Sequence, residues 1–212
     1  MPSDNRNKPE VHTAAVAFGL TGAFWFAFAT SIGMMAAGYL IAPDFLANIG
    51  LLQFGRIRPI HVNLVLFGFV TPGLLSAAFY YIPKLGRTEL FSQKLGVFNA
   101  VLWNITIAIG IFALSAGYTQ GREYAELIWP VDMLIVVNFL LLFINLAMTL
   151  KNRKEPVLYV SIWYAMAAVV LTGTTYCLGN VIWKPDTGAL VGISDAILLW
   201  FYGHNIFGLL LT

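Results

Sequence analysis

Two histidines stand inside long apolar stretches of the chain and are its best candidates for chemistry. His61 belongs to the segment GRIRPIHVN at residues 55–63, and His204 belongs to WFYGHN at residues 200–205. A polar ring placed in hydrocarbon costs free energy unless something there uses it, and imidazole nitrogens are common metal ligands. We therefore predict that both rings bind metal, and that the remaining chain holds them at chosen depths.

The surroundings of His61 suggest a flat cofactor. On a helix, Gly68 and Pro72 share a face with His61. Gly68 would leave the backbone bare for a macrocycle, and Pro72 should bend the helix. Haem ligation is one hypothesis for His61, and a hydrogen bond across helices is the other. Arg56 and Arg58 could contact haem propionates or anchor the helix at lipid headgroups.

The surroundings of His204 predict a dry pocket. Its neighbours at helical spacing are aromatic or lack a side chain: Trp200, Phe201, Phe207 and Gly208. Copper or zinc would need two or more further ligands, and the other histidines are His61 and His12, the latter expected in solvent or at the interface. Cys177 is the sole cysteine, which excludes a thiolate cluster within the chain. We therefore expect the chain to be a fragment or half of a split subunit, with a partner completing the site.

A polar loop adds carboxylates. Glu123 and Glu126 are three residues apart, and at the start of a helix they would face the same way. They could offer oxygen ligands to a hard cation such as calcium, or simply be solvated. Asp132, near the start of the next apolar stretch, could be a buried polar contact or a group that carries a proton.

The composition places these residues in a membrane protein. Of 212 residues, 59% are apolar and 10% are charged, against about 25% charged in soluble domains. The mean hydropathy is +0.78. Stretches without charge predict an all-α protein with a terminal segment at 1–12 and six transmembrane helices near 13–41, 58–82, 92–116, 129–149, 157–180 and 193–212. The net charge of +2 lies in loops and does not indicate nucleic-acid binding.

The loops also predict an orientation. The side of the N-terminus would collect Arg6, Lys8, Lys84, Arg87, Lys94, Lys151, Arg153 and Lys154. The opposite side would collect Arg56, Arg58, Arg122 and Lys184. Positive residues favour the cytoplasmic side, so we predict a cytoplasmic N-terminus. His61 would then lie just inside the outer face, and His204 would lie deeper.

Three segments together carry a family resemblance: residues 55–63, residues 121–130 (GREYAELIWP) and residues 195–212 around WFYGHN. At these motifs the chain resembles the catalytic subunit (subunit I) of cbb3-type cytochrome c oxidases, in the haem-copper oxidase superfamily. The resemblance implies the N-terminal half of a twelve-helix bundle. It implies that His61 binds the low-spin haem b, and that His204 is one of three ligands of the copper called CuB. It also places Glu123 near a calcium ion that bridges haem propionates, with Glu126 in support.

The implied activity is reduction of O2 to water with electrons from cytochrome c, coupled to proton translocation in the bacterial cytoplasmic membrane. The implied partners are the remainder of subunit I, membrane-anchored c-type cytochrome subunits, cytochrome c and the lipid bilayer. The second half of the subunit would hold the other copper histidines, a crosslinked tyrosine and the ligand of the high-spin haem b3. This chain alone is therefore not expected to reduce oxygen.

Three alternatives remain open. The large subunit of nitric oxide reductase shares the first histidine, but we would expect a glutamate one turn after His204, where residues 205–208 read NIFG. A non-catalytic membrane haem protein would favour paired histidines at similar depth. Half of a transporter would favour broken helices with polar residues at the midplane.

Overall fold

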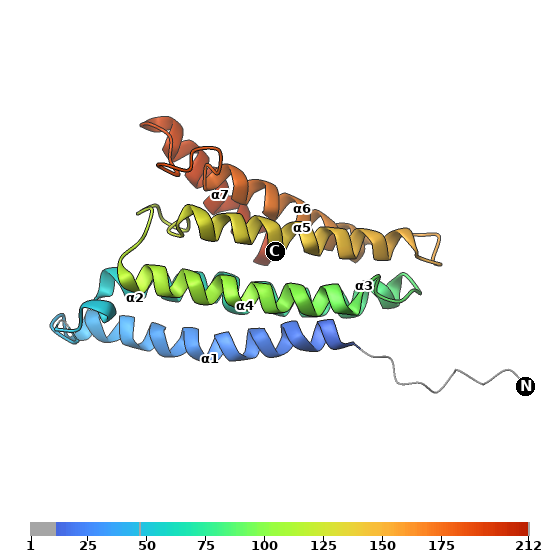
Figure 1. Ribbon diagram of the computed structural model, residues 1–212, viewed down its shortest axis with the longest axis horizontal. Coiled ribbons are helices and arrows are strands. Elements are labelled where there is room, and N and C mark those ends of the chain that lie inside the picture. Colours follow the sequence, from blue (N-terminus) through green and yellow to red (C-terminus); the bar gives the residue numbers. More distant parts are fainter. Residues whose placement is uncertain (1–11, 47, 212) are drawn as a thin grey trace, which may run out of the picture.

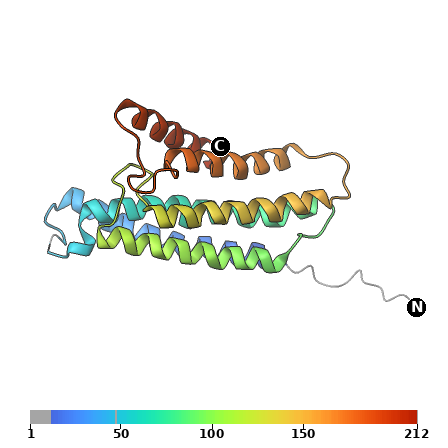
Figure 2. The same ribbon diagram turned by 45° about the horizontal axis from the view of Figure 1, so that its top comes forward.

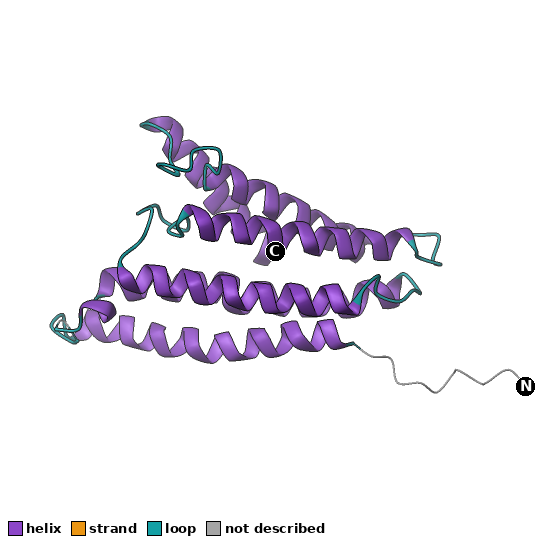
Figure 3. Ribbon diagram, viewed as in Figure 1, coloured by secondary structure: helices purple, strands orange, loops and turns teal. Residues whose placement is uncertain are grey.

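The computed structural model describes residues 12–46 and 48–211, and this part of the chain is helical without strands (Figures 1 and 3). The elements are α1 (Thr13–Ile41), η2 (Gly50–Leu52), α2 (Phe54–Asn63), η3 (Leu64–Val70), α3 (Thr71–Leu85), α4 (Gln93–Ala116), α5 (Trp129–Lys151), α6 (Val160–Gly179) and α7 (Ile193–Leu211). Six helices are long and apolar enough to cross a membrane, because α2, η3 and α3 run on as one span. The predicted all-α architecture with six membrane-length helices is confirmed.

The predicted boundaries differ most in the second span. It occupies Phe54–Leu85, whereas the absence of charge predicted 58–82. Arg56 and Arg58 lie within the helix. Both side chains bond to polar partners at the end of the bundle, so their charges do not end the span there. The predicted division of the chain at residue 12 and the placement of the N-terminal segment stay predictions, because residues 1–11 lie outside the described residues.

Proline at position 72 changes the helical register of the second span. The seven residues of η3 form a π-helix, and the N–H of Thr71 bonds to the carbonyl of Leu66, five residues earlier. In that register the carbonyl of Phe67 would pair with residue 72, but proline has no N–H. The indole Nε1 of Trp103 on α4 donates to this carbonyl instead, at 2.7 Å. The disturbance predicted at Pro72 therefore takes the form of a π-helix, stabilised by a neighbouring helix.

Small residues allow α1 to lie close against the second span. A Cβ added to Gly22 would lie 3.4 Å from the backbone of Gly73, so the two helices approach with no side chain between them. The hydroxyl of Ser76 donates to the carbonyl of Ala15 on α1, at 2.7 Å. Close contact of this kind is how helices associate in lipid, where the hydrophobic effect does not drive association.

The six spans form two groups. The helices α1, α2–α3, α4 and α5 pack into one bundle around the large buried side chains Phe18, Phe67, Phe79 and Trp103. The helices α6 and α7 form a hairpin that packs mainly on itself and reaches the bundle chiefly through α5 (Figure 2). His61 lies on the first group and His204 on the hairpin, so the contacts between the groups decide how the histidines are placed.

Candidate functional site

His61 is pressed against α1 and uses one ring nitrogen there. Its Nδ1 lies 2.9 Å from the carbonyl oxygen of Ala29, which can only accept a hydrogen bond. Nδ1 therefore carries the proton, and Nε2 keeps the lone pair that binds metal. A Cβ added to Gly33 would lie only 2.6 Å from Cε1 of the ring, so α1 also restricts the ring sterically. Both hypotheses for His61 are thus compatible, because the cross-helix hydrogen bond leaves a free ligand nitrogen.

The expected role of Gly68 is wrong. Instead of presenting bare backbone, Gly68 is buried against α1, and a Cβ added there would lie 2.9 Å from Cβ of Trp25. The small residue serves helix packing, as glycines commonly do in membranes. A macrocycle bound at Nε2 of His61 would therefore not rest on this glycine.

The two arginines near His61 have partners within the chain. Arg56 donates from Nη1 to the carbonyl of Ser115 at 2.6 Å, and its guanidinium lies beside Gly117, the left-handed residue that ends α4. Arg58 forms an ion pair with Glu123, and both side chains remain partly exposed. Each guanidinium retains further N–H donors. Contacts of Arg56 and Arg58 with haem propionates stay a prediction.

The two loop glutamates do not sit on a helix, so the expectation that helical spacing aligns them is wrong. Arg122 and Ala125 form an isolated β-bridge, and Tyr124 between them has φ +64°. Glu123 turns to Arg58, while Glu126 is 5% exposed and accepts a hydrogen bond from Nδ2 of Asn63 at 3.1 Å. Burial raises the pKa of Glu126, and the bond from Asn63 partly opposes that rise.

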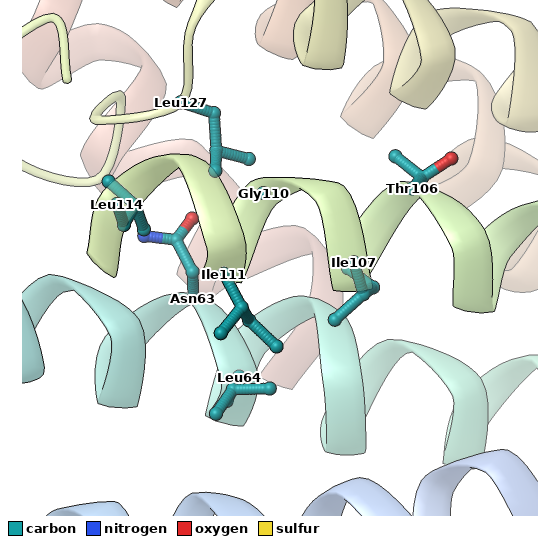
Figure 4. Close-up of a pocket in the computed structure, with 8 residues that line it drawn as sticks. All are labelled: Asn63, Leu64, Thr106, Ile107, Gly110, Ile111, Leu114 and Leu127. Carbon is teal, nitrogen blue, oxygen red and sulfur yellow. The ribbon is translucent and has the colours of Figure 1, made fainter. Parts of the chain in front are cut away.

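A small cavity lies beside Asn63, between the second span, α4 and the loop that precedes α5. It is lined by Asn63, Leu64, Thr106, Ile107, Gly110, Ile111, Leu114 and Leu127 (Figure 4). Its volume of about 10 Å³ is room for about one water molecule. A macrocycle therefore cannot bind in this space, and His61, which does not line it, is partly exposed.

His204 faces away from the rest of the described chain, and the predicted aromatic pocket around it is wrong. The neighbouring Trp200 is 56% exposed, and a Cβ added to Gly208 would meet nothing within 4 Å. Trp200 and Phe207 pack instead against Tyr124, with ring centroids 6.4 and 5.1 Å away. The described residues contain no group of three His, Cys, Asp or Glu side chains able to hold a metal. A metal at His204 would take its other ligands from elsewhere.

Two buried polar contacts connect this end of the bundle. Asp132, fully buried on α5, accepts from the hydroxyl of Tyr176 at 2.6 Å and from Nε2 of Gln120 at 3.0 Å. Asp132 is thus a buried polar contact, and its role as a proton carrier stays a prediction. The second contact joins Arg122 to Asp195, and the sequence alone did not predict it. No sequence spacing pairs residues 73 positions apart, although an arginine in a loop and an aspartate in the first turn of a helix were the available signal.

Comparison with known proteins gives the family of the chain. The chain matches the family Cytochrome C and Quinol oxidase polypeptide I over residues 13–212. It is 30% identical to the cbb3-type cytochrome c oxidase subunit CcoN1 of Stutzerimonas stutzeri over 199 residues, covering 92% of this chain and 42% of that protein. It is 33% identical to cytochrome c oxidase subunit 1 of Rhodobacter capsulatus over 170 residues, covering 77% and 32%.

A nitric oxide reductase is also similar. One subunit of the Stutzerimonas stutzeri nitric oxide reductase is 30% identical over 156 residues, covering 63% of this chain and 32% of that protein. The chain spans less than half the length of these curated relatives. The family match extends over all six membrane-length helices and includes both histidines. The chain therefore belongs to the Cytochrome C and Quinol oxidase polypeptide I family, the subunit I family of the haem-copper oxidases.

Proposed function

We propose that the chain is part of the catalytic subunit of a cbb3-type terminal oxidase in the bacterial cytoplasmic membrane, with its N-terminus in the cytoplasm. The complex would reduce O2 to water with electrons from cytochrome c and translocate protons. The observation that carries this proposal is the state of His61. Its Nδ1–H is bound to the carbonyl of Ala29, and its Nε2 is left for iron on a membrane-length helix of a haem-copper oxidase chain.

His61 would be the axial ligand of the low-spin haem b. A b-type haem with this ligation passes single electrons. The contact with Ala29 sets the tautomer of the ring, and Gly33 limits its rotation, so the chain holds the ligand nitrogen in one direction. Arg58 would bind the haem propionates, since guanidinium groups pair with carboxylates. Arg56 would do so through the N–H donors that its bond to Ser115 leaves free.

His204 would be one ligand of CuB. Its exposure on α7 supports this role, because a side chain that shares a metal with other helices must point outward from its own helix. The other copper ligands and the haem b3 ligand would belong to the remainder of subunit I. The c-type cytochrome subunits and cytochrome c would deliver electrons to the assembled complex.

Glu123 would be a ligand of calcium, with Glu126 in support. The exposed ion pair with Arg58 can open at little cost, since such pairs contribute about 0–1 kcal/mol. A cation would then take the place of Arg58 at the carboxylate. Glu126 would keep its hydrogen bond from Nδ2 of Asn63.

Calcium removal tests this assignment. In the purified complex, a chelator should lower the thermal midpoint of haem loss, because calcium bound only to the folded state stabilises it, and added calcium should restore the midpoint. Glu123→Gln should abolish the response. The matched control is Glu155→Gln, whose carboxylate pairs with Arg87 near the ends of α3 and α5 and should leave the response unchanged. An equal response in Glu123→Gln would remove calcium from this residue.

Turnover of the purified complex tests the reaction itself. With reduced cytochrome c we expect the complex to consume oxygen faster than nitric oxide. Nitric oxide reductase is the second candidate, since the similarity to the Stutzerimonas stutzeri reductase favours it specifically. Faster consumption of nitric oxide would establish the second candidate. Haem bands without consumption of oxygen or nitric oxide would indicate a non-catalytic haem protein. The absence of haem bands would indicate a transporter.

A further inference from the structure

One loop contacts both helices that carry the candidate ligands. We call residues 119–126 the bridging loop. On the side of His61 it is bound to the second span twice, through Glu123 to Arg58 and through Glu126 to Asn63. Asn63 lies two residues after His61, so this end of the loop is hydrogen-bonded to the helix within two residues of the candidate ligand.

On the side of His204 the bridging loop is bound through Arg122. Its guanidinium makes two parallel bonds to the carboxylate of Asp195 at the start of α7, at 3.1 and 2.9 Å. Its Nη1 also donates to the carbonyls of Gly179, at the end of α6, and Gly188, at 2.7 Å each. Arg122 is only 6% exposed. A bidentate pair with a buried guanidinium and this many satisfied donors restricts geometry more than a surface ion pair does.

Tyr124 makes a second attachment to α7. Its ring packs edge-on against Trp200 and Phe207, which lie one turn before and one turn after His204. Its backbone carbonyl accepts a hydrogen bond from the hydroxyl of Tyr202, at 3.0 Å. Tyr124 adopts φ +64°, a region that non-glycine residues rarely occupy and that persists where surrounding contacts enforce it.

Few other contacts place α7 relative to the first bundle. Its main neighbour is α6, where Gly179 admits Tyr202 so closely that a Cβ at position 179 would lie 2.2 Å from Cβ of Tyr202. These contacts make the hairpin rigid, and α6 packs the hairpin against α5 and α3. The bridging loop adds a direct connection between α7 and the helix of His61, since the same eight residues bind both sides.

We infer that Arg122 and Asp195 are positioning residues that set the placement of α7, and with it His204, relative to the helix of His61. The inference rests on the proposed role of His204 as a copper ligand. Arg122 does not touch a ligand side chain, so it would act by fixing the start of α7. The low-spin haem site should be independent of the pair, because His61 is held by Ala29 and Gly33 on α1.

The test measures copper and low-spin haem separately in the assembled complex. Asp195→Asn keeps the shape of the side chain and leaves the bonds of Arg122 to both glycine carbonyls, so folding is favoured. We expect the copper affinity, measured as copper retained against a chelator per low-spin haem, to fall about 10–100-fold, as when outer-shell partners of metal ligands are lost. Copper affinity should fall less in Arg122→Lys than in Arg122→Gln, because a lysine can still reach one acceptor.

A double-mutant cycle and a control sharpen this test. If Arg122 and Asp195 act as one pair, the double variant Arg122→Gln with Asp195→Asn should retain as much copper as the single variant that retains less copper. Arg87→Gln removes an exposed arginine from its ion pair with Glu155, away from the bridging loop, and should retain full copper. Full copper in both Asp195→Asn and Arg122→Lys would overturn the inference. Loss of copper and low-spin haem together would also overturn it, since that outcome assigns the pair to folding as a whole.

Failure of this inference differs from failure of the proposed function. His204→Ala in the same complex reports on the ligand role alone. If His204→Ala keeps its copper, the proposed ligand is wrong, and the inference falls with it. If His204→Ala loses copper while the variants of Arg122 and Asp195 keep it, the ligand role stands and the positioning role is wrong.

Discussion

Replacing His61 by alanine should remove the low-spin haem b spectrum from the complex almost completely. The substitution deletes the nitrogen that the tautomer leaves free for iron, and the described residues contain no group of three or more His, Cys, Asp or Glu side chains that could hold a metal instead. Because electrons would pass through this haem, turnover should fall with it. Optical spectra of the reduced complex measure the haem, and oxygen consumption measures turnover.

A second variant separates ligand loss from general damage near His61. Gly33→Ala keeps the histidine but would place a Cβ 2.6 Å from its Cε1, so the ring must shift. We expect haem b to stay bound with altered bands. Gly73→Ala is the matched control, because a Cβ at this other helical glycine would meet nothing within 4 Å. Haem bands of normal height in His61→Ala, with His12→Ala as the control histidine, would contradict the assignment of His61.

The second large effect is expected at His204. His204→Ala should remove most of the copper from the assembled complex and leave the low-spin haem intact, since the two sites lie on separate helix groups. Loss of one of three ligands should lower the affinity by more than the roughly 10–100-fold that loss of an outer-shell partner costs. Metal analysis normalised to low-spin haem gives the result.

Exposure of His204 makes this experiment clean. The ring makes no contact that an alanine would leave unsatisfied among the described residues, so the variant should fold, and its thermal midpoint should stay close to that of the original protein. His12→Ala again serves as the control. Unchanged copper in His204→Ala would show that the metal takes its ligands elsewhere.

The membrane helices could be predicted from the sequence because lipid imposes a simple rule. A charge within the hydrocarbon is costly, so charge-free stretches mark the spans. The rule was least accurate at Arg56 and Arg58, which extend the second span by binding Ser115 and Glu123. These partners are far away in the sequence, and the absence of charge carries no information about them.

Side-chain surroundings were harder to predict than helices. Gly68 was expected to face a cofactor, yet it packs on Trp25, because the close approach of α1 is a tertiary effect. The aromatic residues around His204 were expected to enclose it, yet two of them pack on Tyr124. Helical spacing says which residues share a face, but not what lies opposite that face.

The sequence by itself determined the class of protein, the six spans and the two histidines, because apolar length and rare polar residues are local properties of a chain. Only the tertiary structure decided which nitrogen of His61 is free, since that depends on the carbonyl of Ala29 in another helix. It also decided that Arg122 joins Asp195. Contacts between distant segments depend on how the helices pack together, and no local pattern records that.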